Sequence, residues 1–318
     1  MGAIGLVILG LLLLAVGGEV LVRGATRVAR IAGLTPAVIG LTVVALGTSL
    51  PELVVSVSAA AQDRASLAIA NVVGSNILNI TGTLGLVALI TPLPARTTLV
   101  RLEWPALLLA SAAALLVMRD GVVDRYEGSS FVIALVVFTA YSVYIARREA
   151  TQQEQVSLAK QADAHAPGQP RGIAYSLALL ALGLSMLIVG GDLLVDGAVR
   201  MARSLGVSER RIGLTVVAIG TGAPEIAATL AAALRKHTDI AMGNLIGSNI
   251  FNVLGILGVA ALWRPLRFES TLVAYDAWWM LGTALLLLPV ILIGARVTRA
   301  EGALLLGIYV TYLATITR

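Results

Sequence analysis

Residues 47–52 read GTSLPE and residues 74–79 read GSNILN. The same two motifs return later in the chain, as GTGAPE at 220–225 and GSNIFN at 247–252. Every member of the second set lies 173 positions after its counterpart in the first, with no insertion between them. Both sets place a glutamate, an amide and hydroxyls inside long apolar runs. An ionisable group in a bilayer-length segment is energetically costly and indicates a functional site.

The composition is typical of a protein with many membrane spans. Its 318 residues are 58% hydrophobic and 13% charged, with a mean hydropathy of +0.91, whereas a soluble domain is about 25% charged. The arginines lie in short connections, which fits anchoring in the lipid bilayer, and no basic stripe is interleaved with aromatics, so we expect no nucleic-acid partner. The chain has no cysteine, which excludes disulfides and thiolate chemistry.

The apolar runs are each close to the roughly 20 residues that a helix needs to cross a bilayer. We therefore predict an all-α integral membrane protein with ten transmembrane helices. The predicted spans are 4–22, 36–61, 67–90, 99–118, 129–146, 173–195, 211–234, 239–263, 272–294 and 302–316.

A polar stretch at 147–171 is predicted to be a flexible linker between two halves, 1–146 and 172–318. Each half has five predicted spans, so the second half enters the membrane upside down relative to the first. The sequence thus predicts two inverted five-helix repeats, an architecture that commonly places its substrate near the membrane midplane. The basic residues of the first connection, Arg23 and Arg27 among them, favour an outside N-terminus, and we expect both termini outside.

The polar residues of the motifs are spaced for one helix face. Residues four apart face the same way on a helix, and four such pairs occur: Thr48 with Glu52, Ser75 with Asn79, Thr221 with Glu225, and Ser248 with Asn252.

A proline directly precedes each glutamate, at Pro51 and Pro224. Because proline has no N–H and clashes with the preceding turn, we expect a bend there and freed carbonyls around Gly47 and Gly220. A freed carbonyl at membrane depth needs a partner, and a cation can be that partner.

All these candidate ligands are oxygens, which suit Ca²⁺, Mg²⁺ or an alkali ion. The two histidines, His165 and His237, lie in polar connections and are expected to be solvated. Two carboxylates can neutralise one divalent cation or two monovalent ones. A site that can be filled in either way is the electrostatic basis of an exchanger.

The paired motifs resemble the two alpha-repeats of the cation/Ca²⁺ exchanger superfamily, and the sodium/calcium exchanger branch most closely. The resemblance covers all ten predicted spans. It implies a secondary active antiporter, not an enzyme, that exchanges Ca²⁺ for Na⁺ by alternating access without a cofactor. It also implies a prokaryotic inner-membrane protein that functions as a monomer.

The resemblance further implies two sets of ligands. The Ca²⁺ ligands would be Glu52, Asn79, Glu225 and Asn252. The Na⁺ ligands would be Thr48, Ser49, Glu52, Ser75, Thr221, Glu225 and Ser248, with the backbone carbonyls of Ala45 and Ala218.

Two positions depart from the common prokaryotic pattern. Gly222 stands where a serine matching Ser49 is expected, and Asn252 stands where an aspartate is often found. The missing hydroxyl leaves the sodium dependence open, so a proton-driven or other divalent-cation exchanger of the same fold is an alternative. A cation channel is a weaker one, because two occluding carboxylates favour saturable binding over permeation. For any single Ser, Thr or Asn, a plain hydrogen bond between membrane helices, worth about 0.6 kcal/mol, is an alternative.

Overall fold

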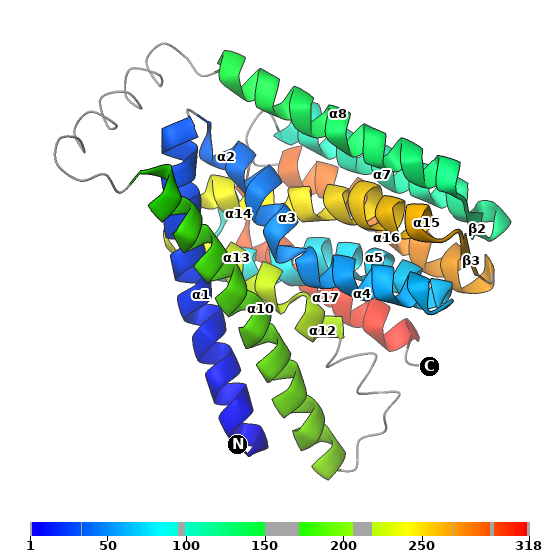
Figure 1. Cartoon of the computed structure of the whole chain (residues 1–318), viewed down its shortest axis with the longest axis horizontal. Helices are drawn as coiled ribbons and strands as arrows, with labels where there is room; N and C mark the ends of the chain where they lie inside the picture. The colour runs from blue at the N-terminus through cyan, green and yellow to red at the C-terminus, as the bar shows by residue number, and fades with distance from the viewer. Residues whose placement is uncertain are drawn as a thin grey trace.

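The chain is helical because a bilayer offers no water to its backbone polar groups, which helices satisfy internally. The structure is a computed structural model (Figure 1). It describes residues 2–32, 34–94, 99–149, 172–205, 218–268, 270–292 and 296–316. Within these ranges the chain forms helices and four two-residue strands.

The first half contains α-helices, short π-helical segments (η1, η2 and η3) and a 3₁₀ turn (η4). Its elements are α1 (Ala3–Ala32), α2 (Pro36–Ile39), η1 (Gly40–Val44), α3 (Ala45–Thr48), α4 (Leu50–Ala61), α5 (Ala65–Ile77), η2 (Leu78–Thr83), α6 (Leu84–Ile90), β1 (Leu93–Pro94), η3 (Leu99–Glu103), α7 (Trp104–Val117), η4 (Met118–Asp120), β2 (Val122–Val123) and α8 (Arg125–Glu149).

The elements of the second half follow one another in nearly the same order as those of the first half. Its described elements are α10 (Ile173–Ser204), α12 (Ala218–Thr221), α13 (Ala223–Leu234), α14 (Thr238–Ile250), the π-helical η6 (Phe251–Leu257), α15 (Gly258–Trp263), β3 (Leu266–Arg267), α16 (Ser270–Leu292), β4 (Arg296–Val297) and α17 (Arg299–Ile316). The helices α3, α4 and α5 recur as α12, α13 and α14 at the 173-residue offset of the motifs.

The protein is an all-helical membrane protein. Six described segments are long and apolar enough to cross a membrane: Ala3–Ala29, Ala65–Ile90, Leu99–Asp120, Arg125–Ile145, Ile173–Met201 and Thr238–Trp263. A bent pair, Pro36–Thr48 with Leu50–Ala61, can form a seventh, and Ala223–Leu234 and Tyr275–Val290 are shorter apolar helices. The predicted linker from residue 150 onward and the predicted span start at 211–217 lie outside the described residues.

Some predicted span ends are wrong. The first helix runs on to Ala32, although its span was predicted to end at residue 22, and the sixth continues to Ser204 instead of 195. Charged side chains do not end a helix, because they can reach the headgroups while the backbone stays helical. Within α1, Arg23 pairs with Glu19 one turn earlier at 2.5 Å.

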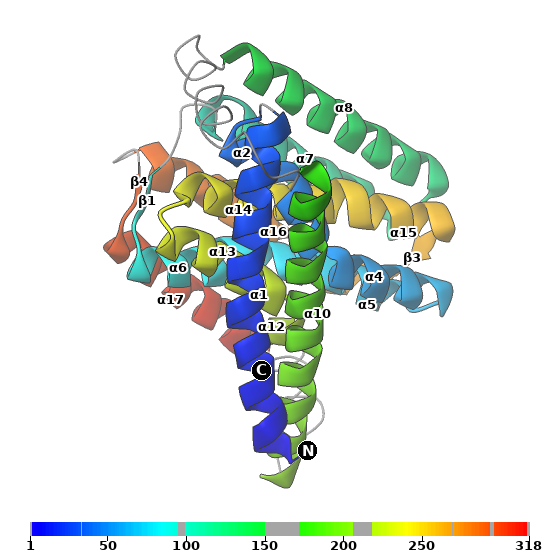
Figure 2. The ribbon, with the colours of Figure 1, turned by 60° about the vertical axis from the view of Figure 1, so that its left-hand side comes forward.

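The two long helices α1 and α10 lie side by side and cross the other helices (Figures 1 and 2). Both carry a glycine at every seventh residue along the contact: Gly10, Gly17 and Gly24 on α1, and Gly183, Gly190 and Gly197 on α10. A Cβ added at Gly10 would lie 2.7 Å from the backbone nitrogen of Leu194, and one at Gly183 would lie 2.6 Å from that of Leu21. The helices are therefore antiparallel and meet backbone to backbone, as small residues allow in membranes.

Two short ladders join the halves of the chain. Strand β1 pairs antiparallel with β4, and β2 pairs antiparallel with β3. In each ladder one strand comes from the first half and one from the second. Two helix pairs also connect the halves. Helix α6 of the first half packs on α17 of the second, and α15 of the second half packs on α8 of the first.

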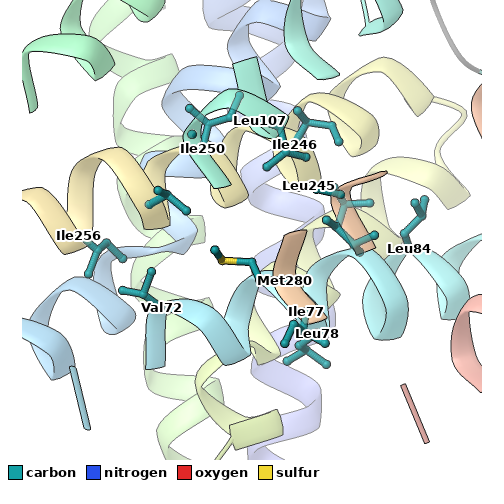
Figure 3. Packing of buried hydrophobic residues seen from close by; sticks show 14 of the residues in the cluster. Val72, Ile77, Leu78, Leu84, Leu107, Leu245, Ile246, Ile250, Ile256 and Met280 are labelled. Atoms are coloured by element: carbon teal, nitrogen blue, oxygen red, sulfur yellow. The ribbon is translucent and has the colours of Figure 1, made fainter. Parts of the chain in front are cut away.

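The core lies where α5, α7, α14 and α16 meet (Figure 3). Met280 and the aliphatic side chains of Ile77, Leu107 and Ile250 are almost fully buried there. This apolar packing surrounds the motif residues and keeps them away from the surface.

Candidate cation-binding site

The first motif lies at a helix break. Helix α3 ends at Thr48, Ser49 has φ −85° and ψ 8°, and α4 begins at Leu50 with Pro51 in its first turn. The helical segments before and after this break are bent by 46°. The bend predicted from the proline is confirmed.

The second motif has the same backbone. Helix α12 ends at Thr221, Gly222 has φ −81° and ψ 2°, and α13 begins at Ala223. Gly222 thus occupies the conformation of Ser49, which a residue with a side chain can also adopt.

Each break places a glutamate in the first turn of the following helix. Glu52 and Glu225 are both 1% exposed. A helix N-terminus favours a negative charge, although two buried carboxylates still need a positive partner or a proton.

A hydrogen bond joins the two motifs directly. The hydroxyl of Ser49 donates to Oε1 of Glu225 at 3.0 Å. Gly222 has no side chain with which to make the equivalent bond to Glu52. The two halves therefore build the site unequally.

The two amides predicted as ligands lie in π-helical segments, Asn79 in η2 and Asn252 in η6. Both are buried, at 2% and 1% exposed. The four-residue spacing predicted one helix face for each polar pair, and the structure departs from a regular α-helix between the members of all four pairs. Thr48 and Glu52 are separated by a break, as are Thr221 and Glu225, and the amides of the other two pairs follow a change from α to π geometry. Such π-helical turns are frequent at functional sites.

Several oxygens of the motifs have no hydrogen-bond partner. In the described part of the chain these include Oε2 of Glu52, Oε2 of Glu225, Oγ of Ser248 and Oδ1 of Asn252, all buried. An unpaired buried polar atom costs about 1–3 kcal/mol, so four such atoms in three of the motifs call for a partner that oxygen can bind. Hard cations are such partners.

The remaining predicted ligands are also in or beside the motifs. Thr48 is buried and donates to Oδ1 of Asn244 at 3.2 Å, while Ser75 is buried and Thr221 is half-buried. The carbonyl of Ala45 accepts the N–H of Ser49 at 3.1 Å and the hydroxyl of Thr48 at 3.4 Å. Ala218 opens α12 as Ala45 opens α3.

Among the described residues, no three His, Asp or Glu side chains come together as a metal cluster. The arrangement can therefore offer two carboxylates and otherwise neutral oxygens. That donor set suits Ca²⁺ or Na⁺.

Two asparagines that hydrogen-bond to motif residues were not identified in the sequence analysis. Asn71 donates to the carbonyl of Glu52 at 3.1 Å and to Ser56 at 2.9 Å. Asn244 donates to Thr229 at 2.9 Å, and it accepts from Thr48. Asn71 and Ser56 lie 173 positions before Asn244 and Thr229, so the offset of the motifs could have found them.

The fold and the buried oxygens are those of an integral membrane protein for cation transport. A family model described as sodium/calcium exchanger protein matches residues 2–144 and 175–318. The chain belongs to this family, whose members are cation/Ca²⁺ antiporters, not enzymes, and need no cofactor.

Curated relatives match over almost the whole chain. Putative antiporter CaxA from Alkalimonas amylolytica is 37% identical over 96% of this chain and 96% of its own length. Inner membrane protein YrbG from Escherichia coli is 36% identical over 98% and 96%, and sodium/calcium exchanger MaX1 from Methanosarcina acetivorans is 29% identical over 98% and 97%.

A solved structure of the sodium-calcium exchanger NCX_Mj, soaked with zero Na⁺ and Ca²⁺, has the same fold. It superimposes with a TM-score of 0.84 at 32% identity and covers 98% of each chain. The resemblance inferred from the paired motifs is confirmed at the level of the family.

Proposed function

We propose that the protein exchanges Ca²⁺ for Na⁺ across the membrane at a site formed by Glu52 and Glu225. One observation carries the proposal. Two fully buried glutamates, one from each half, sit at matching helix breaks, and each has an oxygen without a hydrogen-bond partner among the described residues.

The charge of the site favours exchange. Two carboxylates balance one Ca²⁺, and the same two balance two Na⁺ ions. The proposed Ca²⁺ ligands are the two glutamates with Asn79 and Asn252. The proposed Na⁺ ligands add neutral oxygens from Ala45, Thr48, Ser49, Ser75, Ala218, Thr221 and Ser248.

The two halves are proposed to be inverted five-helix repeats, 1–146 and 172–318, with the site near the midplane and open to one side at a time. The antiparallel pair α1 and α10 supports this, because the two helices are counterparts in the repeat. We place both termini outside a prokaryotic cell membrane, since Arg23 and Arg27 lie in the last third of α1. A single chain supplies both glutamates, which is consistent with a functional monomer.

The proposal is tested by ⁴⁵Ca²⁺ uptake into proteoliposomes. Vesicles loaded with Na⁺, with K⁺ or with a proton gradient are compared with vesicles that have no gradient. Uptake driven by internal Na⁺ is expected. Uptake driven only by protons would move the assignment to a proton/Ca²⁺ exchanger, and no uptake under any gradient would contradict Ca²⁺ exchange.

Replacing Gly222 by serine is expected to lower the Na⁺ concentration needed for half-maximal exchange. The backbone there already has the conformation of Ser49, and a hydroxyl at 222 restores an oxygen on the side of Glu52. A gained polar contact of typical strength corresponds to roughly a twofold to tenfold change. Na⁺-driven Ca²⁺ flux is measured against Na⁺ concentration for both proteins.

The Ser49→Ala variant is the matched control, because it removes the hydroxyl from the other half. We expect it to raise the Na⁺ concentration needed. Equal Na⁺ dependence in Gly222→Ser and the wild type would mean that position 222 contributes nothing to sodium binding.

A further inference from the structure

A chain of buried amides connects the two GSN motifs and ends on Asn252, a proposed Ca²⁺ ligand. Asn76 donates through Nδ2 to the backbone carbonyl of Asn249 at 3.2 Å, and the same nitrogen lies 3.6 Å from the sulfur of Met280. Asn252 donates through its own Nδ2 to Oδ1 of Asn76 at 3.0 Å. All three asparagines are at most 1% exposed.

The direction of this chain is fixed by one group. A backbone carbonyl can only accept a hydrogen bond, so the NH₂ of Asn76 must face Asn249. Oδ1 of Asn76 then faces Asn252, and the NH₂ of Asn252 must donate to it. The other end of the Asn252 amide, Oδ1, is left buried and without a hydrogen-bond partner in the described residues.

We infer that Asn76 is a positioning residue that turns the carbonyl oxygen of Asn252 toward a bound cation. The inference rests on the proposed function, and Asn76 itself is not a proposed ligand. It also gives a reason for the amide at 252. An aspartate there would have no hydrogen to donate, so Asn76 would have to turn and leave the Asn249 carbonyl unpaired.

The repeat provides a matched control. Asn249 is the counterpart of Asn76, equally buried, but its side chain donates to the carbonyl of Leu245 in its own helix at 2.7 Å. Its Oδ1 has no hydrogen-bond partner among the described residues. Removing the Asn249 side chain therefore takes an amide out of the same region without touching Asn252.

The test is a double-mutant cycle read by calorimetric Ca²⁺ binding to purified protein. Asn76→Leu, Asn252→Ala and the double variant are compared with the wild type. Misplacing the Asn252 oxygen should reduce the binding free energy by about as much as the loss of one hydrogen bond. Asn76→Leu is therefore expected to weaken Ca²⁺ binding roughly tenfold. In the Asn252→Ala background the same change is expected to have no further effect. Asn249→Leu is expected to lose clearly less Ca²⁺ affinity than Asn76→Leu.

The outcomes separate the inference from the function on which it rests. Wild-type affinity in Asn76→Leu, or effects of the two single variants that add, would overturn the positioning role, and so would an equal loss in Asn249→Leu. Absence of Ca²⁺ binding in the wild type would overturn the proposed function and the inference with it. If Asn76→Leu does not yield folded protein by gel filtration, Asn76→Ser takes its place, because its hydroxyl is too short to reach both partners.

Discussion

Replacing Glu225 by glutamine is expected to abolish Ca²⁺ transport. Glutamine keeps an oxygen that can accept the hydrogen bond from Ser49 but removes a charge from a buried site. Two unit charges about 4 Å apart attract by roughly 4 kcal/mol at an effective dielectric constant of 20. Ca²⁺ affinity should therefore fall at least about 100-fold. Calorimetry measures the loss of Ca²⁺ affinity, and ⁴⁵Ca²⁺ uptake measures the loss of transport. Glu52→Gln is expected to show the same two losses.

Glu301→Gln is the control for the loss of a carboxylate. Glu301 accepts a hydrogen bond from the backbone N–H of Thr298 at 2.7 Å at the start of α17, and it belongs to neither motif. The Glu301→Gln variant should therefore have the Ca²⁺ affinity of the wild type. If Glu52→Gln and Glu225→Gln both kept wild-type uptake, the site would have to lie elsewhere.

Replacing Gly247 by alanine is expected to destabilise the protein by about 1–3 kcal/mol. An added Cβ would run into the backbone carbonyl of Leu41, and it would lie 2.8 Å from the Cβ of Ala45. A carbonyl held in a helix cannot rotate away as a flexible side chain can. Because Ser248, a proposed Na⁺ ligand, follows directly, the variant should also need a higher Na⁺ concentration for half-maximal exchange. Thermal unfolding of the purified protein measures the first effect.

Gly282→Ala is the matched control for this substitution. A Cβ at Gly282 meets nothing within 4 Å, and Gly282 also lies in a long apolar helix. Its melting temperature should equal that of the wild type or exceed it slightly, since alanine favours a helix. Equal stability of Gly247→Ala and Gly282→Ala would show that α14 can move away from Leu41 without cost.

The local chemistry of the motifs could be predicted because it acts within a few residues. Pro51 lacks an N–H and clashes with the turn before it, so a bend was predictable without knowledge of any neighbour. Glu52 and Glu225 could be singled out because charge in an apolar run is costly wherever the chain folds.

Features that depend on packing could not be predicted in the same way. No residue type marks the change from α to π geometry at Asn79 and Asn252, because it concerns which carbonyl each N–H reaches. The end of α1 was missed because Arg23 resembles a loop residue, yet it continues the helix and pairs with Glu19. The bond from Asn252 to Asn76 joins residues 176 positions apart and needs the tertiary structure.

The length of α1 and α10 has a consequence for the surrounding lipid. They contain 30 and 32 residues, or about 45 and 48 Å at 1.5 Å per residue, while the hydrocarbon layer is only about 30 Å thick. The pair must therefore tilt strongly or hold its ends beyond the hydrocarbon. Thickening the bilayer with longer acyl chains would let this pair stand more upright, whereas the shorter helices would become too short for the hydrocarbon layer. Lipid chain length thus becomes a mechanical variable for the exchanger, applied through two helices that contribute none of the proposed cation ligands.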